Sequence, residues 1–531
     1  MTRLNLLEAL TDNIVVDKDK CIYCGRCVET CVLDNLRLKL APCGQGCPLG
    51  VNAQGYVQEV KRGHDDKARE ILRDKLIFPE ILGRICPAPC ENKCHRGRVG
   101  EGAVAVRAIK RYLTDGQKAE DIPVPKTAEA TGKKVAVIGS GPAGLQAAHD
   151  LRLAGHEVEV YESQEKPGGM MRWAIPEFRL PTEVLERELS LLERLGIRFK
   201  CGVKVNSKAT VAGLSHDYDA VVMAVGCPGT AQLGIEGENL KGVYYGLDVL
   251  KSARNRDGLS FNGALVVIGG GNVAMDAAQV ALRLGAERVT VVSLESAGEL
   301  PAFPVEVAEA KAAGVEFEHS WGPVRFIAED GKVSGVELQR CTAVFDAKGT
   351  FKPRFDSCIR QTIPAAAVIV AIGQKRRDDL WAGWGEIDSL TLRAGASNIF
   401  LAGDCRTGPS SVVEAMAGGR QAAESVRRFL AGEHLKYGRA YQGPVETEFD
   451  INTSLGSDAP RVVPPHQDFP GQGDFAELEG RLDQAAARTE AGRCYSCGQP
   501  FGKFRTCWFC LPCEVDCPEN ALWVEVPYLL R

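Results

Sequence analysis

The chain has 531 residues, which at about 150 residues per domain predicts three or four domains. Hydrophobic residues make up 45% and charged residues 25%, as in ordinary globular proteins, and a net charge of -5 argues against a nucleic-acid partner. Its longest apolar runs are about half as long as a membrane-spanning helix, and residues 1–20 lack the apolar core of a signal peptide. We therefore expect a cytoplasmic chain without a membrane span.

The cysteines are unusually numerous and unevenly spread. Fifteen of the twenty lie within 21–31, 43–94 and 494–517. In a long chain without an export signal, grouped cysteines stay reduced and usually bind metal. The grouping therefore predicts metal centres rather than disulfides.

The spacing C-x2-C-x2-C-x3-C occurs near each end of the chain, at Cys21, Cys24, Cys27 and Cys31 and at Cys507, Cys510, Cys513 and Cys517. Bacterial ferredoxins hold iron–sulfur cubes with this run, and its fourth cysteine often serves a second cube nearby. Structural zinc usually takes two separated C-x2-C pairs, so such tight packing favours [4Fe–4S] clusters. A further pair, Cys494 and Cys497, either completes a second cube beside the C-terminal run or consists of spare thiols.

The stretch "KKVAVIGSGPAGLQAAHDLRLAGHEVEVYES" predicts a strand, a glycine-rich turn, a helix and a second strand, with the fingerprint at Gly139, Gly141, Gly144 and Glu162. These features have the spacing of a dinucleotide-binding βαβ unit of about 30 residues. Such glycines let the backbone and the helix N-terminus approach a pyrophosphate, and the acidic residue takes the ribose hydroxyls.

A second βαβ unit follows in "ALVVIGGGNVAMDAAQVALRLGAERVTVVSLES", with the binding candidates Gly269, Gly271, Asn272, Ala274 and Glu295. We therefore expect two bound nucleotides. Further on, "NIFLAGDCRTGPSSVVEAMAGGRQAAESV" predicts a strand, Gly403 and Asp404, and a helix that begins near Val412. Such an aspartate can hold a ribityl chain while the helix N-terminus faces the electron-rich end of an isoalloxazine ring.

Several of these motifs together resemble one family: "GSGPAG", "YESQEKPGGMMRWAIPEFRLP", "AVGCPG", "GGGNVAMD" and "AGDCRTGPSSVVEAMAGGRQAA". They are similar to the small, FAD-containing subunit of glutamate synthase and its relatives, which include part of dihydropyrimidine dehydrogenase and stand-alone NAD(P)H:acceptor oxidoreductases. The resemblance covers about residues 40–432. It implies an α/β two-dinucleotide-binding-domain flavoprotein in which an NAD(P) domain interrupts the FAD domain, and it adds Gly168 and Gly169 to the FAD site.

The segment before the flavoprotein motifs resembles the helical iron–sulfur domain of the same family, with matching cysteines at Cys43, Cys47, Cys86, Cys90 and Cys94. The family normally has another C-x2-C pair ahead of these, but here that region reads "LDNLRLKL". Five cysteines suffice for one cube with a spare thiol, and a second cube would need an outside ligand. We expect three or four [4Fe–4S] clusters in all.

The resulting domain hypothesis has seven segments: an N-terminal ferredoxin-like module (1–40), the helical iron–sulfur domain (41–125), the first part of the FAD domain (133–245), the NAD(H) domain (246–364), the second part of the FAD domain (365–432), a linker with a short helix (433–490) and a C-terminal ferredoxin-like module (491–531).

The leading functional hypothesis is an FAD- and iron–sulfur-dependent NADH:acceptor oxidoreductase that converts hydride chemistry to one-electron transfer inside a larger complex. Its expected partners are ferredoxin or cluster-bearing enzyme subunits in a hetero-oligomer. In the NADPH-using relatives two arginines stand where this chain has Leu294 and Glu295, which favours NADH; Arg288 or another base is the alternative phosphate ligand. Alternative functions are an NADPH-dependent glutamate synthase small subunit, a redox-sensing scaffold and, less favoured, a flavin disulfide reductase.

Overall fold

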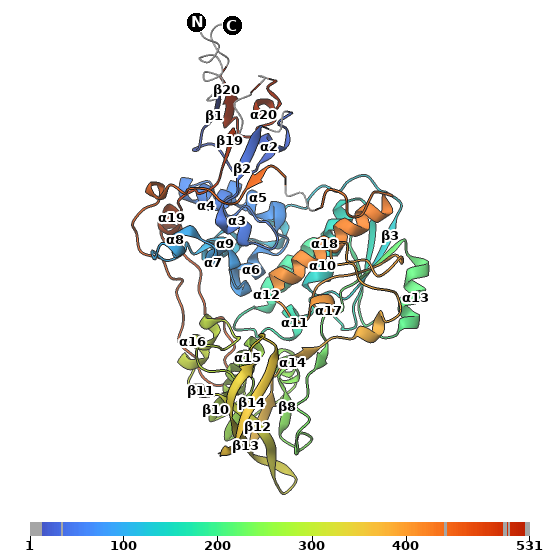
Figure 1. Cartoon of the computed structure of the whole chain (residues 1–531), viewed down its shortest axis with the longest axis vertical. Coiled ribbons are helices and arrows are strands. Elements are labelled where there is room, and N and C mark those ends of the chain that lie inside the picture. Colours follow the sequence, from blue (N-terminus) through green and yellow to red (C-terminus); the bar gives the residue numbers. More distant parts are fainter. Residues whose placement is uncertain (1–12, 33–34, 440–442, 503–506, 508–509, 526–531) are drawn as a thin grey trace. The chain divides into compact units, whose positions relative to one another are not determined.

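The computed structural model in Figure 1 describes residues 13–32, 35–439, 443–502, 507 and 510–525. These residues form two compact units. Unit 1 contains the described parts of 1–122, 434–465 and 481–531, and unit 2 contains 123–433 and 466–480. No helix among the described residues is long and apolar enough to cross a membrane.

The first sheet of unit 2 is parallel and has the strand order β17 (Ile399–Leu401), β6 (Ala220–Met223), β3 (Lys134–Ile138), β4 (Glu157–Tyr161) and β5 (Arg198–Lys200). Its central strands are almost continuously apolar and buried, as expected for a parallel sheet covered on both faces. The helices of this part are α10 (Pro142–Leu153), α11 (Met170–Trp173), α12 (Thr182–Arg194), α13 (Lys208–Asp217), α17 (Asp404–Thr407) and α18 (Val412–Leu430).

Helices α10 and α18 cross at very close range. A Cβ atom added to Gly419 would overlap the carbonyl oxygen of Ala143, and one added to Gly418 would lie 3.0 Å from the backbone nitrogen of Gly403. Gly419 therefore lets α18 pack backbone against backbone on α10, and Gly418 lets α18 approach the turn at Gly403.

The second sheet of unit 2 is also parallel, with the order β11 (Glu316–His319), β10 (Arg288–Ser293), β9 (Ala264–Ile268), β15 (Ala367–Val370) and β8 (Val243–Tyr245). Its helices are α14 (Gly246–Asn255), α15 (Asn272–Arg283) and α16 (Pro304–Ala312). An antiparallel sheet of β12 (Trp321–Glu329), β13 (Lys332–Phe345) and β14 (Phe351–Pro364) is inserted after β11. A short pair joins β7 (Gly229–Thr230) to β16 (Gln374–Lys375).

Both boundaries of this inserted part differ from the domain hypothesis. Strand β15 pairs with β9 and β8, so the chain returns to the first part only after Val370, not at residue 365. Strand β8 likewise belongs to the second sheet, so the inserted part begins before residue 246. An apolar strand such as "AVIV" has the same sequence signature in either sheet, because both sheets are buried and parallel.

The helical part of unit 1 consists of α3 (Pro42–Gly46), α4 (Ala53–Arg62), α5 (Asp65–Lys75), α6 (Pro79–Ile85), α7 (Pro89–Asn92), α8 (His95–Arg98), α9 (Val106–Thr114) and α19 (Gln484–Gly492). The short helix expected before Cys494 is α19, which packs on α4 and α9 although it follows them by several hundred residues. The intervening segment is mostly irregular, and 466–480 packs with unit 2, where the Gly473 N–H donates to the Arg283 carbonyl at 2.9 Å.

The two ends of the chain meet in unit 1. Strand β1 (Ile14–Val16) pairs antiparallel with β20 (Leu522–Val524). Strand β2 (Leu36–Lys39) lies between β18 (Val445–Glu446) and β19 (Gln499–Gly502). With α2 (Arg26–Glu29) and α20 (Pro512–Val515), these strands form what we call the terminal module, so the two expected ferredoxin-like segments lie side by side.

Candidate dinucleotide and cluster sites

The first glycine-rich turn connects β3 to α10. Gly139 has φ of 102°, and a Cβ on it would overlap the carbonyl oxygen of Ala224; a Cβ on Gly144 would overlap the carbonyl oxygen of Gly139. A Cβ on Gly141, by contrast, would meet nothing within 4 Å. Two glycines therefore allow the tight turn, and Gly141 leaves open space at the N-terminus of α10, where a pyrophosphate is bound in such units.

The carboxylate of Glu162 lies directly on this turn. It is buried and accepts hydrogen bonds from the Ser140 N–H at 3.0 Å and the Gln164 N–H at 2.8 Å. Gly168 and Gly169 cover the same turn: the Gly168 N–H donates to Ser140, and a Cβ on Gly169 would lie 2.6 Å from the Gly141 Cα. The structure thus brings together six expected FAD residues: Gly139, Gly141, Gly144, Glu162 and, from the "KPGGM" loop, Gly168 and Gly169.

Gly403 and Asp404 follow β17 and stand beside α10. Gly403 has φ of 68°, and a Cβ there would lie 2.6 Å from the Ala143 Cβ. Burial raises the pKa of Asp404, although the Ser410 hydroxyl donates to its carboxylate at 2.6 Å. Val412 is the first residue of α18, and Ser411 caps that helix through a reciprocal pair of hydrogen bonds with Glu414.

The second glycine-rich turn connects β9 to α15 in the same manner. Gly269 has φ of 138° and would clash with the carbonyl oxygen of Ala371 if it carried a side chain, while Gly271 faces open space. Asn272 begins α15 and its side-chain oxygen accepts the Phe303 N–H at 2.8 Å, so it holds the loop before α16. Ala274 is completely buried under the turn.

Glu295 lies against this second turn. A Cβ on Gly270 would be 2.9 Å from the Glu295 carboxylate, and burial raises the pKa of Glu295. Arg288, the alternative phosphate ligand, is the first residue of β10, whereas Glu295 lies two residues beyond its last residue. At about 3.3 Å per residue, the strand that lies between them is roughly 17 Å long.

The two cysteine runs form interleaved groups in the terminal module. Burial, and then the thiols of Cys21, Cys24, Cys517 and, last, Cys513, raise the pKa of Cys27 to about 12. Burial, and then Cys31, Cys507 and Cys510, raise the pKa of Cys513 to about 11. Each group therefore contains three cysteines of one run and the fourth of the other, as in ferredoxins with two cubes.

Backbone groups are arranged to stabilise thiolates in this module. The sulfur of Cys31 accepts the N–H groups of Asn35 and Leu36 at 3.3 and 3.4 Å, and the Cys517 sulfur accepts the Ala521 N–H at 3.2 Å. Eight cysteines with such donors suit two [4Fe–4S] cubes, whose potentials depend on hydrogen bonds to the ligand sulfurs.

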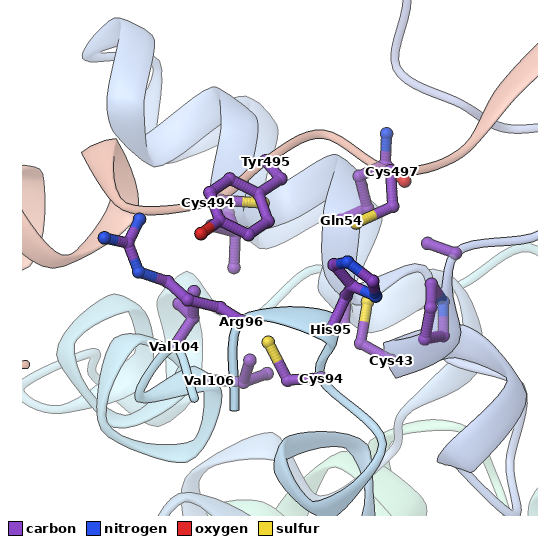
Figure 2. A pocket seen from close by; sticks show the side chains of 14 residues that line it. Cys43, Gln54, Cys94, His95, Arg96, Val104, Val106, Cys494, Tyr495 and Cys497 are labelled. Atoms are coloured by element: carbon purple, nitrogen blue, oxygen red, sulfur yellow. The ribbon is translucent and has the colours of Figure 1, made fainter. Parts of the chain in front are cut away.

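The remaining seven grouped cysteines lie in the helical part of unit 1. Cys43, Cys94, Cys494 and Cys497 line one pocket, shown in Figure 2. Cys90 has Cys86 and Cys47 as thiol neighbours. Burial raises the pKa of Cys90, and the Lys110 ammonium offsets only part of that rise. Sequence reasoning did not connect Cys494 and Cys497 with this domain; the absent pair ahead of Cys43 was the available signal.

Among the described residues, no three His, Cys, Asp or Glu side chains converge closely enough to hold one metal ion. A cube does not require such convergence, because each of its thiolates binds a different iron.

Comparison with known proteins identifies the chain. Residues 133–419 match the family described as pyridine nucleotide-disulphide oxidoreductase, which is more than half of the chain. The chain belongs to this family. Residues 7–122 match a second family model, dihydropyrimidine dehydrogenase domain II, 4Fe-4S cluster.

Three curated relatives are subunits of three different enzymes. The beta subunit of an NADP(+)-dependent formate dehydrogenase from Moorella thermoacetica is 32% identical, over 86% of this chain and 70% of its own. The PreT subunit of a Salmonella typhimurium NAD-dependent dihydropyrimidine dehydrogenase is 32% identical, over 73% of this chain and 91% of its own. The glutamate synthase [NADPH] small chain of Escherichia coli is 31% identical, over 78% of this chain and 90% of its own. Solved FprA from Mycobacterium tuberculosis, 20% identical with a TM-score of 0.50, shares the fold over 56% of this chain and 85% of its own.

These matches confirm the resemblance, the fold class and the oxidoreductase hypothesis. As a pyridine nucleotide-disulphide oxidoreductase with the 4Fe-4S domain, the chain is an oxidoreductase that uses FAD, a nicotinamide nucleotide and iron–sulfur chemistry. Its relatives are subunits of larger enzymes, which agrees with a hetero-oligomeric role. The individual ligand residues stay predictions, as does the number of clusters.

Proposed function

We propose that this chain is the electron-entry or electron-exit subunit of a cytoplasmic complex and exchanges electrons between NADH and ferredoxin or a cluster-bearing subunit. When bound, FAD exchanges a hydride with the nicotinamide as two electrons, and each cluster carries one. The observation that supports the proposal is that the chain combines two glycine-rich strand-to-helix turns with a terminal module in which cysteines of both runs lie together.

The chain's own residues position the reactants. Gly139, Gly141 and Gly144, with the N-terminus of α10, would bind the FAD pyrophosphate, and Glu162 would exchange its bond to Ser140 for the ribose hydroxyls. Asp404 and the start of α18 would hold the ribityl chain and the ring. No acid or base is required for hydride transfer, so alignment of the two rings is the main contribution of the protein.

Replacing Cys24 or Cys510 with Ser tests this function. Each change removes a cysteine that the structure describes as exposed on the terminal module. NADH should still reduce the flavin at nearly the normal rate, while electron delivery to a ferredoxin-type acceptor should be lost. Equal loss of both activities would contradict the proposal, and Cys358→Ser, at an exposed cysteine outside the groups, is the matched control.

The preference for NADH rests on Glu295. Its carboxylate lies beside the second turn, where it can accept hydrogen bonds from a free ribose diol and would repel a 2′-phosphate. Such a charge contact is worth at least about 1 to 3 kcal/mol, or roughly ten- to a hundredfold in affinity. We expect kcat/KM to favour NADH, and Glu295→Arg to shift the ratio toward NADPH. Arg288→Ala, at the opposite end of β10, should leave the ratio unchanged. Equal use of both coenzymes by the natural chain would refute the assignment.

A further inference from the structure

The C-x2-C pair at Cys494 and Cys497 lies away from the cysteine run that follows it in sequence. Both side chains point into the pocket that is also lined by Cys43, at the start of α3, and by Cys94, just before α8 (Figure 2). The four cysteines therefore come together around one pocket, although they lie in three separate segments of the chain.

The segment that carries this pair is built into the helical part of unit 1. Gln54 on α4 is buried, donates to the Ser496 hydroxyl at 3.1 Å and the Gly498 carbonyl at 2.8 Å, and accepts the Gly498 N–H at 2.7 Å. A Cβ on Gly498 would lie 2.5 Å from the Lys39 carbonyl oxygen, so only glycine allows this approach. One glutamine side chain thus clamps the backbone on both sides of Cys497.

A buried ion pair fixes the other side of the pair. Arg493 and Glu490 are completely buried and lie 2.7 Å apart. Arg493 also donates to the carbonyls of Glu101, Gly102 and Ala103, while Glu490 accepts the Ala105 N–H at 2.7 Å. These contacts join the residue before Cys494 to the loop that follows α8.

Strand pairing brings the cysteines to the place where the resemblance leads one to expect a pair. That region, "LDNLRLKL", contains β2, and β2 pairs with β19, which begins two residues after Cys497. The register Lys39 to Gln499 places the C-terminal pair beside the segment that runs into Cys43.

We propose that Cys43, Cys94, Cys494 and Cys497 bind one [4Fe–4S] cluster, so that the C-terminal segment supplies the pair that is missing ahead of Cys43. The pocket suits a cube with four thiolate ligands, because the apolar side chains of Ala53, Val57 and Val104 line it together with the four cysteines. The Ser496 N–H points to the Cys494 sulfur at 3.5 Å. The inference rests on the iron–sulfur part of the proposed function and adds a ligand set to it.

The experiment compares iron and acid-labile sulfide in the full chain after anaerobic reconstitution, without any turnover. Cys494→Ala/Cys497→Ala and Cys43→Ala/Cys94→Ala should each lose about four iron atoms per chain, and the quadruple variant should lose no more than either pair. Cys201→Ala/Cys358→Ala, outside the groups, is the control and should keep all its iron. An unchanged iron content in the Cys494/Cys497 variant, or a loss of about eight in the quadruple variant, would overturn the shared site.

Two further readouts keep the test independent of folding and of the function. Iron-edge anomalous diffraction from crystals of the natural chain should show iron among these four sulfurs; zinc there, or no metal while the terminal module holds iron, would overturn the proposal. Flavin reduction by NADH, measured on the same variants, should persist. Its loss with the expected iron change would count against the proposed electron path and leave the ligand set standing.

Discussion

The substitution Arg179→Met should expose the cost of a buried charge network in unit 2. Arg179 donates to both carboxylate oxygens of Asp276 at 2.9 Å and pairs with Glu306, and the two acidic side chains are only 9% and 5% exposed. Removing one member of such a buried ion network costs about 3–5 kcal/mol, because the remaining charges lose their partner. At an unfolding entropy of about 2.1 cal/mol/K per residue, that loss corresponds for unit 2 to a melting temperature lower by roughly 4–7 °C.

The destabilisation should depend on pH. Burial raises the pKa of Glu306 from 4.5 to about 7, since it outweighs the attraction of Arg179. The folded state therefore binds the extra proton, and the stability contributed by Glu306 is lost as pH rises from about 4.5 to 7. Without Arg179 the pKa values of both carboxyls should rise further. The Arg179→Met variant should therefore lose more unfolding free energy at pH 8.5 than at pH 6.

Thermal unfolding followed by flavin fluorescence at these two pH values measures the effect. Arg198→Met is the matched control. Arg198 pairs with Glu157 and Glu159, but its side chain is more than half exposed, so these pairs should contribute under about 1 kcal/mol to the stability. Adding Glu306→Gln to the Arg179→Met variant should reduce the pH dependence. A loss below about 1 kcal/mol, or an equal loss at both pH values, would refute the reasoning.

Three other outcomes are expected. Gly144→Ala should lower the FAD content of the purified chain, because its Cβ would overlap the Gly139 carbonyl oxygen, whereas Gly213→Ala, with open space around its Cβ, should retain FAD; equal occupancy would contradict the turn geometry. Glu490→Ala should destabilise unit 1 by about 3–5 kcal/mol in thermal unfolding, since Arg493 would remain buried without its partner; a loss under about 1 kcal/mol would contradict this. Iron analysis should give about 12 to 16 atoms per chain, and about four would exclude occupied terminal cubes.

Local sequence patterns were sufficient to predict the geometry of the two glycine-rich turns. Gly139 and Gly269 stand at fixed spacings from a strand and a helix, and the steric reason for each glycine lies within its own βαβ unit or the adjacent strand end. The sheet to which β15 belongs was not predictable in this way, because its residues would be buried in a parallel sheet whether it joined the first or the second sheet of unit 2.

Which cysteines belong to the same proposed cluster could not be predicted from local patterns, for a different reason. Spacing identifies three ligands that share one loop, but the fourth ligand comes from whatever the fold brings near. Cys517 joins Cys21 through the pairing of β1 with β20, and Cys497 approaches Cys43 through the pairing of β2 with β19. Both pairings connect strands from opposite ends of the chain, so no window of sequence contains the signal.

The same topology constrains how the protein is assembled. All strands of the two nucleotide-binding sheets lie between Lys134 and Leu401, so these sheets can form as soon as that segment has left the ribosome. The terminal module needs β20, and the buried Gln54 cannot make its bonds until Ser496 and Gly498 are present. Cluster sites that combine cysteines from both ends can therefore be completed only by the finished chain. A chain truncated before Arg493 should consequently retain the residues of both glycine-rich turns. It should lack the fourth ligand of one proposed terminal cube, Cys517, and three of the four ligands of the other.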